Sequence, residues 1–339
     1  MDVWTDLLAW LDAPLAGMPA WSWLLFLGVV IVLLALDLGL FHRQERELSV
    51  RESLRASGFY IVAALAFGGW IWWEFGRDAG LKFLTGYAIE KSLSLDNIFV
   101  ISLIFAALAI PRRLQHRVLF WGILGVLVMR AVLIGFGTAL VHRFDWMLPV
   151  FGALLIVAAV KMLTHDQDQG SVAHGALLAG LRRRLRVTGE LHGRAFLVRL
   201  PHADGSGRRV LWATPLFLAL VMVEAADAVF ALESVPAILA VTEEPYLVYT
   251  SNIFAVLGLR AMYFALAALI QRFAYLKHTL ALILLFVGGK VVIGQFGWHV
   301  PPPASLGIVL SLLAGGVLLS WWRRGAMAEP APSQTHVHA

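Results

Sequence analysis

Residues 118–140, VLFWGILGVLVMRAVLIGFGTAL, form an apolar run of 23 residues with one charged side chain, Arg130, near the middle. A helix of about 20 apolar residues spans the hydrocarbon core of a bilayer. The composition of the 339-residue chain agrees, because 60% is hydrophobic and only 14% is charged, whereas soluble domains carry about 25% charged residues. The sequence therefore predicts an all-α, polytopic membrane protein.

Eight other segments have a similar length and composition. We therefore predict nine transmembrane helices, at residues 20–42, 57–73, 83–109, 118–140, 146–164, 212–240, 247–270, 278–297 and 303–322. They are expected to form one transmembrane domain within residues 1–339, with the first two helices, 20–73, at its periphery. The tail, residues 325–339, is rich in Pro, Ala and Ser and is expected to be disordered.

Lys and Arg residues predict the orientation, because they concentrate in loops on the cytoplasmic side of a membrane. With the N-terminus outside and the C-terminus cytoplasmic, the inside loops hold 19 of the 27 Lys and Arg residues, and the outside loops hold 3. This excess predicts a multi-pass protein of the plasma (inner) membrane, surrounded by the lipid bilayer. It also accounts for the net charge of +5, so no nucleic-acid partner is expected.

The largest soluble segment is the predicted cytoplasmic loop 165–211. Residues 174–187 in this loop are expected to form a basic amphipathic helix on the membrane surface. Residues 195–200 and 210–213 flank a turn that contains Asp204-Gly205, and this pattern predicts a β-hairpin.

Three stretches of the chain recur in the same order, and each pair aligns one kind of ionisable residue. The offsets are 131, 130 and 129 residues, and the aligned pairs are Asp96 with Asp227, Arg130 with Arg260, and Lys161 with Lys290. Each repeat, at about 83–164 and 212–297, holds three predicted helices, so the second copy enters the membrane from the opposite side. Inverted repeats build many secondary transporters, with sites near the bilayer midplane. A duplication without transport is the alternative.

Eleven ionisable residues lie within the predicted helices. Six are acidic: Asp37, Glu90, Asp96, Glu224, Asp227 and Glu233. Five are basic: Lys91, Arg130, Lys161, Arg260 and Lys290. Each costs roughly 2.5–3.5 kcal/mol at the centre of a membrane helix. These groups must therefore pair with each other, face water or bind an ion.

Helical spacing places several acids beside other polar groups. Glu224 and Asp227 lie one turn apart on the same face of a helix. Asp227 and Ser234 share a face two turns apart, and so do Glu90 and Asn97. Two crossing helices with these faces would bring carboxylates, an amide and a hydroxyl together.

We also expect both helices to be interrupted near these groups. Pro236 cannot donate a hydrogen bond to the carbonyl of Leu232, so a kink is expected beside Asp227. The first copy has no proline, but Ser92 and Ser94 are expected to ease a local unwinding there.

Carboxylate, amide, hydroxyl and carbonyl oxygens form a hard ligand set that suits Mn²⁺, Mg²⁺ or Ca²⁺. The candidate metal ligands are Glu90, Asp96, Asn97, Glu224, Asp227, Glu233 and Ser234. In the alternative interpretation, these acids are neutralised in fixed ion pairs. The supporting cations are then Arg130, Arg260, Lys161 and Lys290. Candidates for a pathway to the site are Asp37, Ser92 and Asn252.

The sequence does not indicate an enzyme or a tightly bound cofactor. The absence of cysteine removes thiolate ligands and dithiol redox chemistry. The chain also lacks a Walker-type phosphate loop and a nucleophile–base arrangement. A metal ion would therefore be cargo.

Two motifs resemble the TerC family of integral membrane proteins, in particular its Alx branch, within the LysE-type transporter superfamily. They are Gly86-Tyr-Ala-Ile-Glu-Lys-Ser-Leu-Ser-Leu-Asp-Asn-Ile-Phe-Val100 and Val223-Glu-Ala-Ala-Asp-Ala-Val-Phe-Ala-Leu-Glu-Ser-Val-Pro-Ala-Ile238. The segment Thr250–Tyr263 supports them, and the resemblance runs from about Asp37 to Trp321.

This resemblance implies export of Mn²⁺ from the cytoplasm. The implied site residues are Glu90, Asp96, Asn97, Glu224 and Asp227. The chain departs from the family pattern at Ala226, where Ser is usual, and at Glu233-Ser234, where Asp-Ser is usual. Export against a gradient needs coupling, for which protons are the candidate. The alternative function is a membrane partner that delivers metal to exported proteins, and no protein partner is specified.

Overall fold

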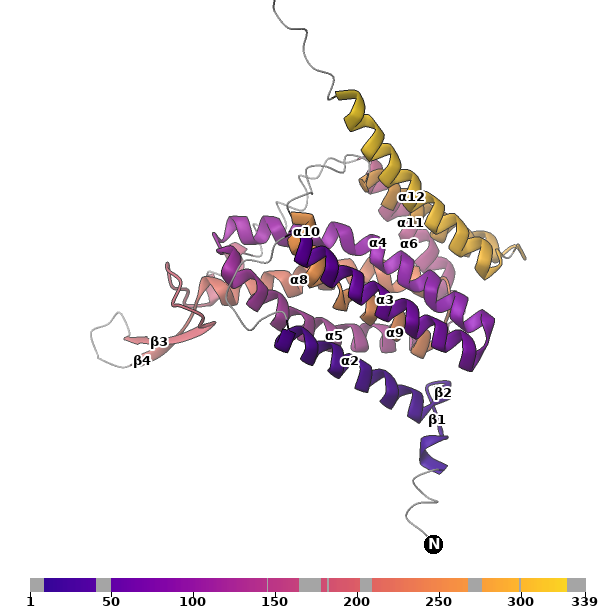
Figure 1. Cartoon of the computed structure of the whole chain (residues 1–339), viewed down its shortest axis with the longest axis horizontal. Coiled ribbons are helices and arrows are strands. Elements are labelled where there is room, and N and C mark those ends of the chain that lie inside the picture. The colour runs from indigo at the N-terminus through magenta and orange to yellow at the C-terminus, as the bar shows by residue number, and fades with distance from the viewer. Residues whose placement is uncertain are drawn as a thin grey trace, which may run out of the picture.

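The structure, a computed structural model, describes residues 9–40, 50–144, 146–164, 178–181, 183–201, 209–267, 276–298 and 300–327. Its long helices are gathered in one bundle (Figure 1). They are α2 (Ala20–Leu40), α3 (Val50–Phe75), α4 (Arg77–Ala107), α5 (Arg112–Arg143), α6 (Met147–Thr164), α8 (Pro215–Leu239), α9 (Pro245–Leu257), α10 (Leu259–Ala267), α11 (Leu276–Gly294) and α12 (Pro302–Met327).

Six helical segments are long and apolar enough to cross a bilayer. They are Val50–Phe75, Arg112–Arg143, Met147–Thr164, Pro215–Leu239, Pro245–Phe264 and Pro302–Ser320. Two further apolar stretches are shorter, Ala20–Leu36 and His278–Gly294. The chain is therefore a polytopic, all-α membrane protein, as the sequence predicts. The larger number of nine transmembrane helices stays a prediction.

Helix α4 lies at the centre of the bundle, because α3, α8, α9 and α12 all pack against it. Its middle is consequently buried on every face, and Ala88, Ile89 and Glu90 are each at most 8% exposed. A helix that is buried all round is normally apolar all round. The carboxylate of Glu90 is therefore an exception that its surroundings must compensate.

Helices α4 and α8 are continuous, so the predicted interruptions beside the acidic residues are wrong. The hydroxyl of Ser92 donates to the carbonyl of Ala88 one turn earlier, and this bond lies within α4. Pro236 stands three residues before α8 ends at Leu239, so its missing N–H affects only the last turn.

An interruption occurs instead at Gly258, between α9 and α10, where the sequence predicts one helix. The ammonium of Lys91 donates to the carbonyl of Ala255, at 3.2 Å, in the last turn of α9. A cation at this end of a helix meets unpaired carbonyls and the negative end of the helix dipole. A Cβ at Gly258 would lie 2.8 Å from the Lys91 nitrogen, so a side chain there would displace the end of the lysine.

Two short hairpins lie outside the helices. Strands β3 (Leu197–Pro201) and β4 (Arg209–Ala213) pair antiparallel, with Leu197 opposite Ala213, at one end of the bundle (Figure 1, left). Of the predicted basic helix 174–187, residues 178–181 and 183–184 are helical, whereas 185–187 are not, and Val187 forms a bridge with Ala213. The first residues of the predicted disordered tail, 325–327, belong to α12 instead. Residues 174–177 and 182, the hairpin turn and the chain from 328 lie outside the described residues. A second hairpin, β1 (Pro14–Leu15) with β2 (Met18–Pro19), precedes α2 and is not predicted by the sequence.

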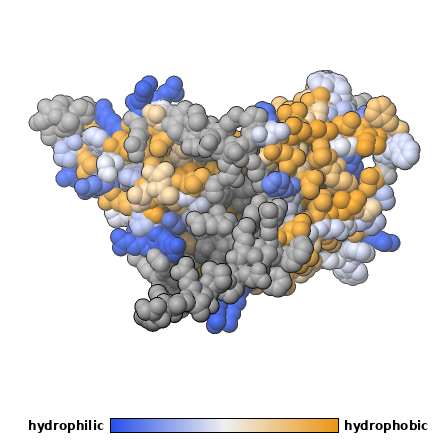
Figure 2. Space-filling view, turned by 90° about the horizontal axis from the view of Figure 1, so that it is seen from above, coloured by the Kyte–Doolittle hydropathy of each residue, from blue (hydrophilic) through white to orange (hydrophobic). Residues whose placement is uncertain are grey.

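Large apolar side chains cover much of the outer surface. Hydrophobic residues predominate in the half of the molecule away from the β3–β4 hairpin (Figure 2, right). On α5, Val128, Val132 and Phe136 are each about two-thirds exposed, at 67%, 65% and 67%. A soluble protein rarely exposes such a contiguous apolar surface. It fits a bundle that faces lipid.

Candidate functional site

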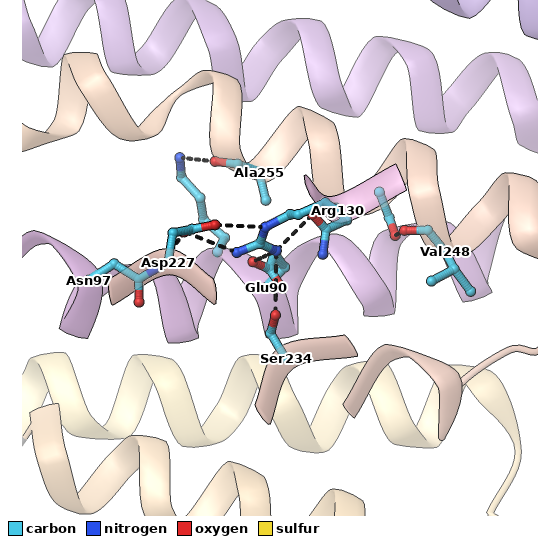
Figure 3. A network of polar contacts seen from close by, with 10 residues as sticks. Glu90, Asn97, Arg130, Asp227, Ser234, Val248 and Ala255 are labelled. Atoms are coloured by element: carbon cyan, nitrogen blue, oxygen red, sulfur yellow. Dashed lines mark hydrogen bonds and ion pairs between the residues drawn. The ribbon is translucent and has the colours of Figure 1, made fainter. Parts of the chain in front are cut away.

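Four helices bring a group of polar side chains together inside the bundle, with Arg130 of α5 at its centre (Figure 3). We call this group the Arg130 cluster. Besides Arg130 it comprises Glu90 and Asn97 of α4, Asp227 and Ser234 of α8, and Asn252 of α9. Arg130 is fully buried, and none of the five partners is more than 6% exposed.

One nitrogen of the guanidinium joins three helices. Arg130 Nη1 forms a close ion pair with Glu90 Oε1. The same nitrogen donates to Asn252 Oδ1 at 2.7 Å and approaches Ser234 Oγ at 3.3 Å. Arginine suits this role, because its guanidinium presents five donors in a fixed fork.

The other side of the guanidinium faces Asp227. Arg130 Nε lies 3.3 Å from Asp227 Oδ2, and Nη2 lies 3.4 Å from Oδ1. This two-point arrangement is the geometry in which arginine binds a carboxylate most specifically. Arg130 therefore holds both buried carboxylates at once, in contacts of the kind that the ion-pair interpretation expects.

Three atoms of the cluster have no hydrogen-bond partner among the described residues. They are Glu90 Oε2, Asn97 Oδ1 and Asn252 Nδ2. Asn97 directs its amide nitrogen to Asp227 Oδ1 at 3.4 Å, which leaves its carbonyl oxygen unused. Buried polar atoms are rarely left unpartnered. The two free oxygens are acceptors, so a cation or a proton would satisfy them.

A small cavity adjoins the cluster between α4, α5, α8, α9 and α10. It has a volume of about 20 Å³ and is lined by Asn97, Asp227 and Arg260 together with apolar side chains. A void of about 10–15 Å³ or more holds a water molecule. The cavity therefore has room for one water or one small ion beside Asp227.

Glu224 lies on α8, one turn before Asp227, and its carboxylate rests against α5 at Gly125. A Cβ at Gly125 would lie 2.5 Å from Glu224 Cδ and 2.7 Å from Oε2. The glycine therefore makes room for the carboxylate. Glu224 is partly exposed, unlike Glu90 and Asp227.

The remaining predicted residues are placed differently. Arg260 is buried on α10 with its guanidinium 5.9 Å from the centre of the Phe120 ring. Lys161 is exposed on α6 and Lys290 half-buried on α11, and neither forms an ion pair with a described carboxylate. The side chains of Asp37, Asp96 and Glu233 lie outside the described residues. Within the described part, no three His, Asp or Glu side chains converge as a metal site.

Sequence reasoning misses two residues and misjudges a third. Gly125 and Gly258 are important because of what approaches them, and a lone glycine in an apolar helix gives no such signal. Asn252, expected on a pathway to the site, contacts Arg130 directly. Its amide in a membrane helix is the signal that could have placed it in the cluster.

The chain is similar to several bacterial membrane proteins over most of their length. Membrane protein STKORF319 of Myxococcus xanthus is 46% identical over 307 residues, which cover 91% of this chain and 93% of that protein. A membrane protein of Rickettsia bellii is 41% identical over 303 residues, or 89% of this chain and 98% of the relative.

A third relative, from Salmonella typhi, has a name that suggests a function, "membrane-bound redox modulator Alx". It is 40% identical over 306 residues, which cover 88% of this chain and 92% of the relative. No solved structure matches the chain. Residues 75–327 match the integral membrane protein TerC family, which confirms the resemblance seen in the two motifs. The chain therefore belongs to the TerC family of integral membrane proteins.

Proposed function

We propose that this TerC-family protein is a secondary transporter that exports a divalent cation from the cytoplasm. The Arg130 cluster carries the proposal, because two carboxylates and two amides from three helices meet there, with two acceptor oxygens unpartnered among the described residues. Oxygen ligands of this kind suit Mn²⁺, Mg²⁺ and Ca²⁺. Mn²⁺ is the proposed cargo because the TerC motifs imply it.

The packing of the helices supports an inverted repeat. Helix α4 packs against α9, and its repeat counterpart α8 packs against α5, the counterpart of α9. Helices α6 and α11, the third pair of counterparts, pack against each other. If the two repeats are exchanged, the α4–α9 contact becomes the α8–α5 contact, and the α6–α11 contact maps onto itself. This pattern is expected of a two-fold axis within the membrane, as in many secondary transporters.

Proton coupling is part of the proposal. The chain has no Walker-type loop for direct use of ATP. Intramembrane carboxylates serve as proton relays in many transporters. Glu90 or Asp227 would then accept a proton as the metal is released, and Arg130 would balance the carboxylate that stays ionised.

The name of the Salmonella typhi relative refers to redox modulation. This chain contains no cysteine, so a thiol–disulfide mechanism is not available to it. Control of a redox-active metal ion is compatible both with that name and with transport.

Flux in liposomes tests the proposal. The purified protein alone should move Mn²⁺ across the bilayer, whereas a metal-delivery partner should not. Asp227→Asn should lower the rate by about tenfold or more, because one lost charge-assisted contact costs about 1.5–3 kcal/mol. The variant should still insert normally, since Glu90 and Arg130 remain a matched pair.

Asp78→Asn is the matched control, because Asp78 is 65% exposed at the start of α4 and far along that helix from Glu90. It should transport at the normal rate. Undiminished flux in Asp227→Asn, or no flux in the unaltered protein, would contradict the proposal. Competition with Mg²⁺ and Ca²⁺ in the same assay would identify the preferred ion.

A further inference from the structure

We propose that Arg130 is a built-in substitute for the transported cation. In the empty protein its guanidinium occupies the cation site, and guanidinium and metal ion bind there alternately. This inference rests on the proposed transport function and deepens it.

The contacts of Arg130 overlap with the candidate metal ligands. The guanidinium binds Glu90, Asp227 and Ser234, three of the residues that sequence analysis assigns to the metal. Both oxygens of Asp227 face Arg130 nitrogens at 3.3 and 3.4 Å. A metal ion that shared both carboxylates with the guanidinium would be disfavoured, because like charges a few ångströms apart repel strongly in a low-dielectric interior.

The charges of the cluster lead to the same conclusion. Glu90 and Asp227 supply two negative charges, and Arg130 supplies one positive charge. A divalent ion in place of Arg130 would neutralise the pair of carboxylates completely. With neither cation present, two buried carboxylates would be left without a counter-charge, which is strongly destabilising.

Two free oxygens mark where a metal ion would first bind. Glu90 Oε2 and Asn97 Oδ1 are buried and have no partner among the described residues. Asn97 also lines the small cavity beside Asp227. An ion that enters there meets the oxygen of Asn97 first, because Glu90 does not line the cavity, and it completes its coordination when Arg130 withdraws.

Alternation of this kind would help the return step that net export requires. A carrier must return empty after it releases its cargo, and an empty site with two uncompensated carboxylates would resist that step. Arg130 would keep the site compensated during the return. It would also lower the affinity for metal and thereby favour release.

The first experiment compares two modes of Mn²⁺ movement in the same liposomes. Net efflux requires the empty protein to return, whereas exchange of labelled for unlabelled Mn²⁺ at equal concentrations does not. Arg130→Gln should retain exchange, and its rate of net efflux should fall about tenfold or more relative to its rate of exchange. Arg143→Gln is the control, because Arg143 is exposed at the end of the same helix. It should leave both modes unchanged.

The second experiment uses Arg130→Lys, which keeps a positive charge and therefore protects folding. An ammonium cannot bind two carboxylates as a fork, so it should compete less well with metal. Mn²⁺ binding in detergent, followed by electron paramagnetic resonance, should become about tenfold tighter if one charge-assisted contact is lost.

The outcomes separate this inference from the proposed function. If the unaltered protein moves no Mn²⁺, the transport function is wrong. If it transports, but the Arg130 variants change net efflux and exchange in equal proportion and leave Mn²⁺ affinity unaltered, Arg130 is only a structural counter-charge. If Arg130→Gln does not fold, the affinity of Arg130→Lys decides the question alone.

Discussion

The approach of α5 to α8 depends on the missing side chain of Gly125. An alanine at this position would place its Cβ 2.5 Å from Glu224 Cδ, so the carboxylate would have to move. We expect Gly125→Ala to lower the free energy of unfolding by about 1 kcal/mol at most, the low end for overpacking, because the end of the Glu224 side chain can move. It should also lower the rate of Mn²⁺ flux. Thermal unfolding in detergent and liposome flux measure the two effects.

Gly135→Ala is the control for this change, because Gly135 lies on the same helix and a Cβ there would meet no other side chain or helix within 4 Å. It should be neutral or slightly stabilising, since alanine is the better helix former by about 1 kcal/mol. Equal effects of the two substitutions would show that the contact with Glu224 has no importance.

At the same scale, sequence identifies the ionisable residues of the site but not their partners. Charges are rare in apolar helices, so Glu90, Arg130 and Asp227 attract notice immediately. Arg130 and Arg260 are equivalent in the repeat alignment, yet Arg130 pairs with both Glu90 and Asp227, while Arg260 lies near Phe120. Which arginine meets which carboxylate depends on how helices cross, and sequence spacing does not contain that information.

The junction of α9 and α10 is held by a side chain from α4. Replacing Lys91 with methionine removes the donor to the Ala255 carbonyl and leaves that group with one partner fewer in a buried place. We expect Lys91→Met to lower the free energy of unfolding by about 1–3 kcal/mol. Thermal unfolding in detergent checks this.

Lys82→Met is the comparison on the same helix. Lys82 pairs with the exposed Asp78 at 2.9 Å, and exposed pairs one turn apart contribute at most about 0.5 kcal/mol. If Lys82→Met lowered the free energy of unfolding as much as Lys91→Met, the effect would not be specific to the Lys91–Ala255 contact. The junction of α9 and α10 would then need another explanation.

The sequence predicts the bounds of a helix well where the helix ends at the edge of its apolar stretch. Helix α6, Met147–Thr164, differs by one residue from the prediction of 146–164. Helix α5 extends from Arg112 to Arg143, well beyond the predicted 118–140. Hydropathy marks how much of a helix lies in lipid, whereas hydrogen bonding continues through polar residues beyond it. The break at Gly258 could not be predicted, because the residues that approach it, Lys91 of α4 and Tyr60 of α3, are distant in sequence.

The whole molecule offers a direct test of orientation, because it contains no cysteine. A single cysteine at Arg199, exposed on β3, should react with an impermeant maleimide only from the cytoplasmic side. A cysteine at Gln295, exposed in the turn after α11, should react only from outside. Labelling of both positions from the same side would contradict the predicted orientation, N-terminus outside and C-terminus cytoplasmic.

The unequal charges of the Arg130 cluster have a genetic consequence. Loss of Arg130 leaves two buried carboxylates unmatched, and breaking a buried pair costs about 3–5 kcal/mol, a large part of the roughly 5–15 kcal/mol that stabilises a protein. Loss of Asp227 instead leaves one carboxylate with one guanidinium. Alleles at Arg130 that deplete the protein should therefore be partly suppressed by second alleles at Asp227 or Glu90, because one unmatched carboxylate remains instead of two. Such suppressors would restore part of the abundance of the protein without restoring efflux. They would show that the folding defect and the transport defect of the Arg130 alleles can be separated.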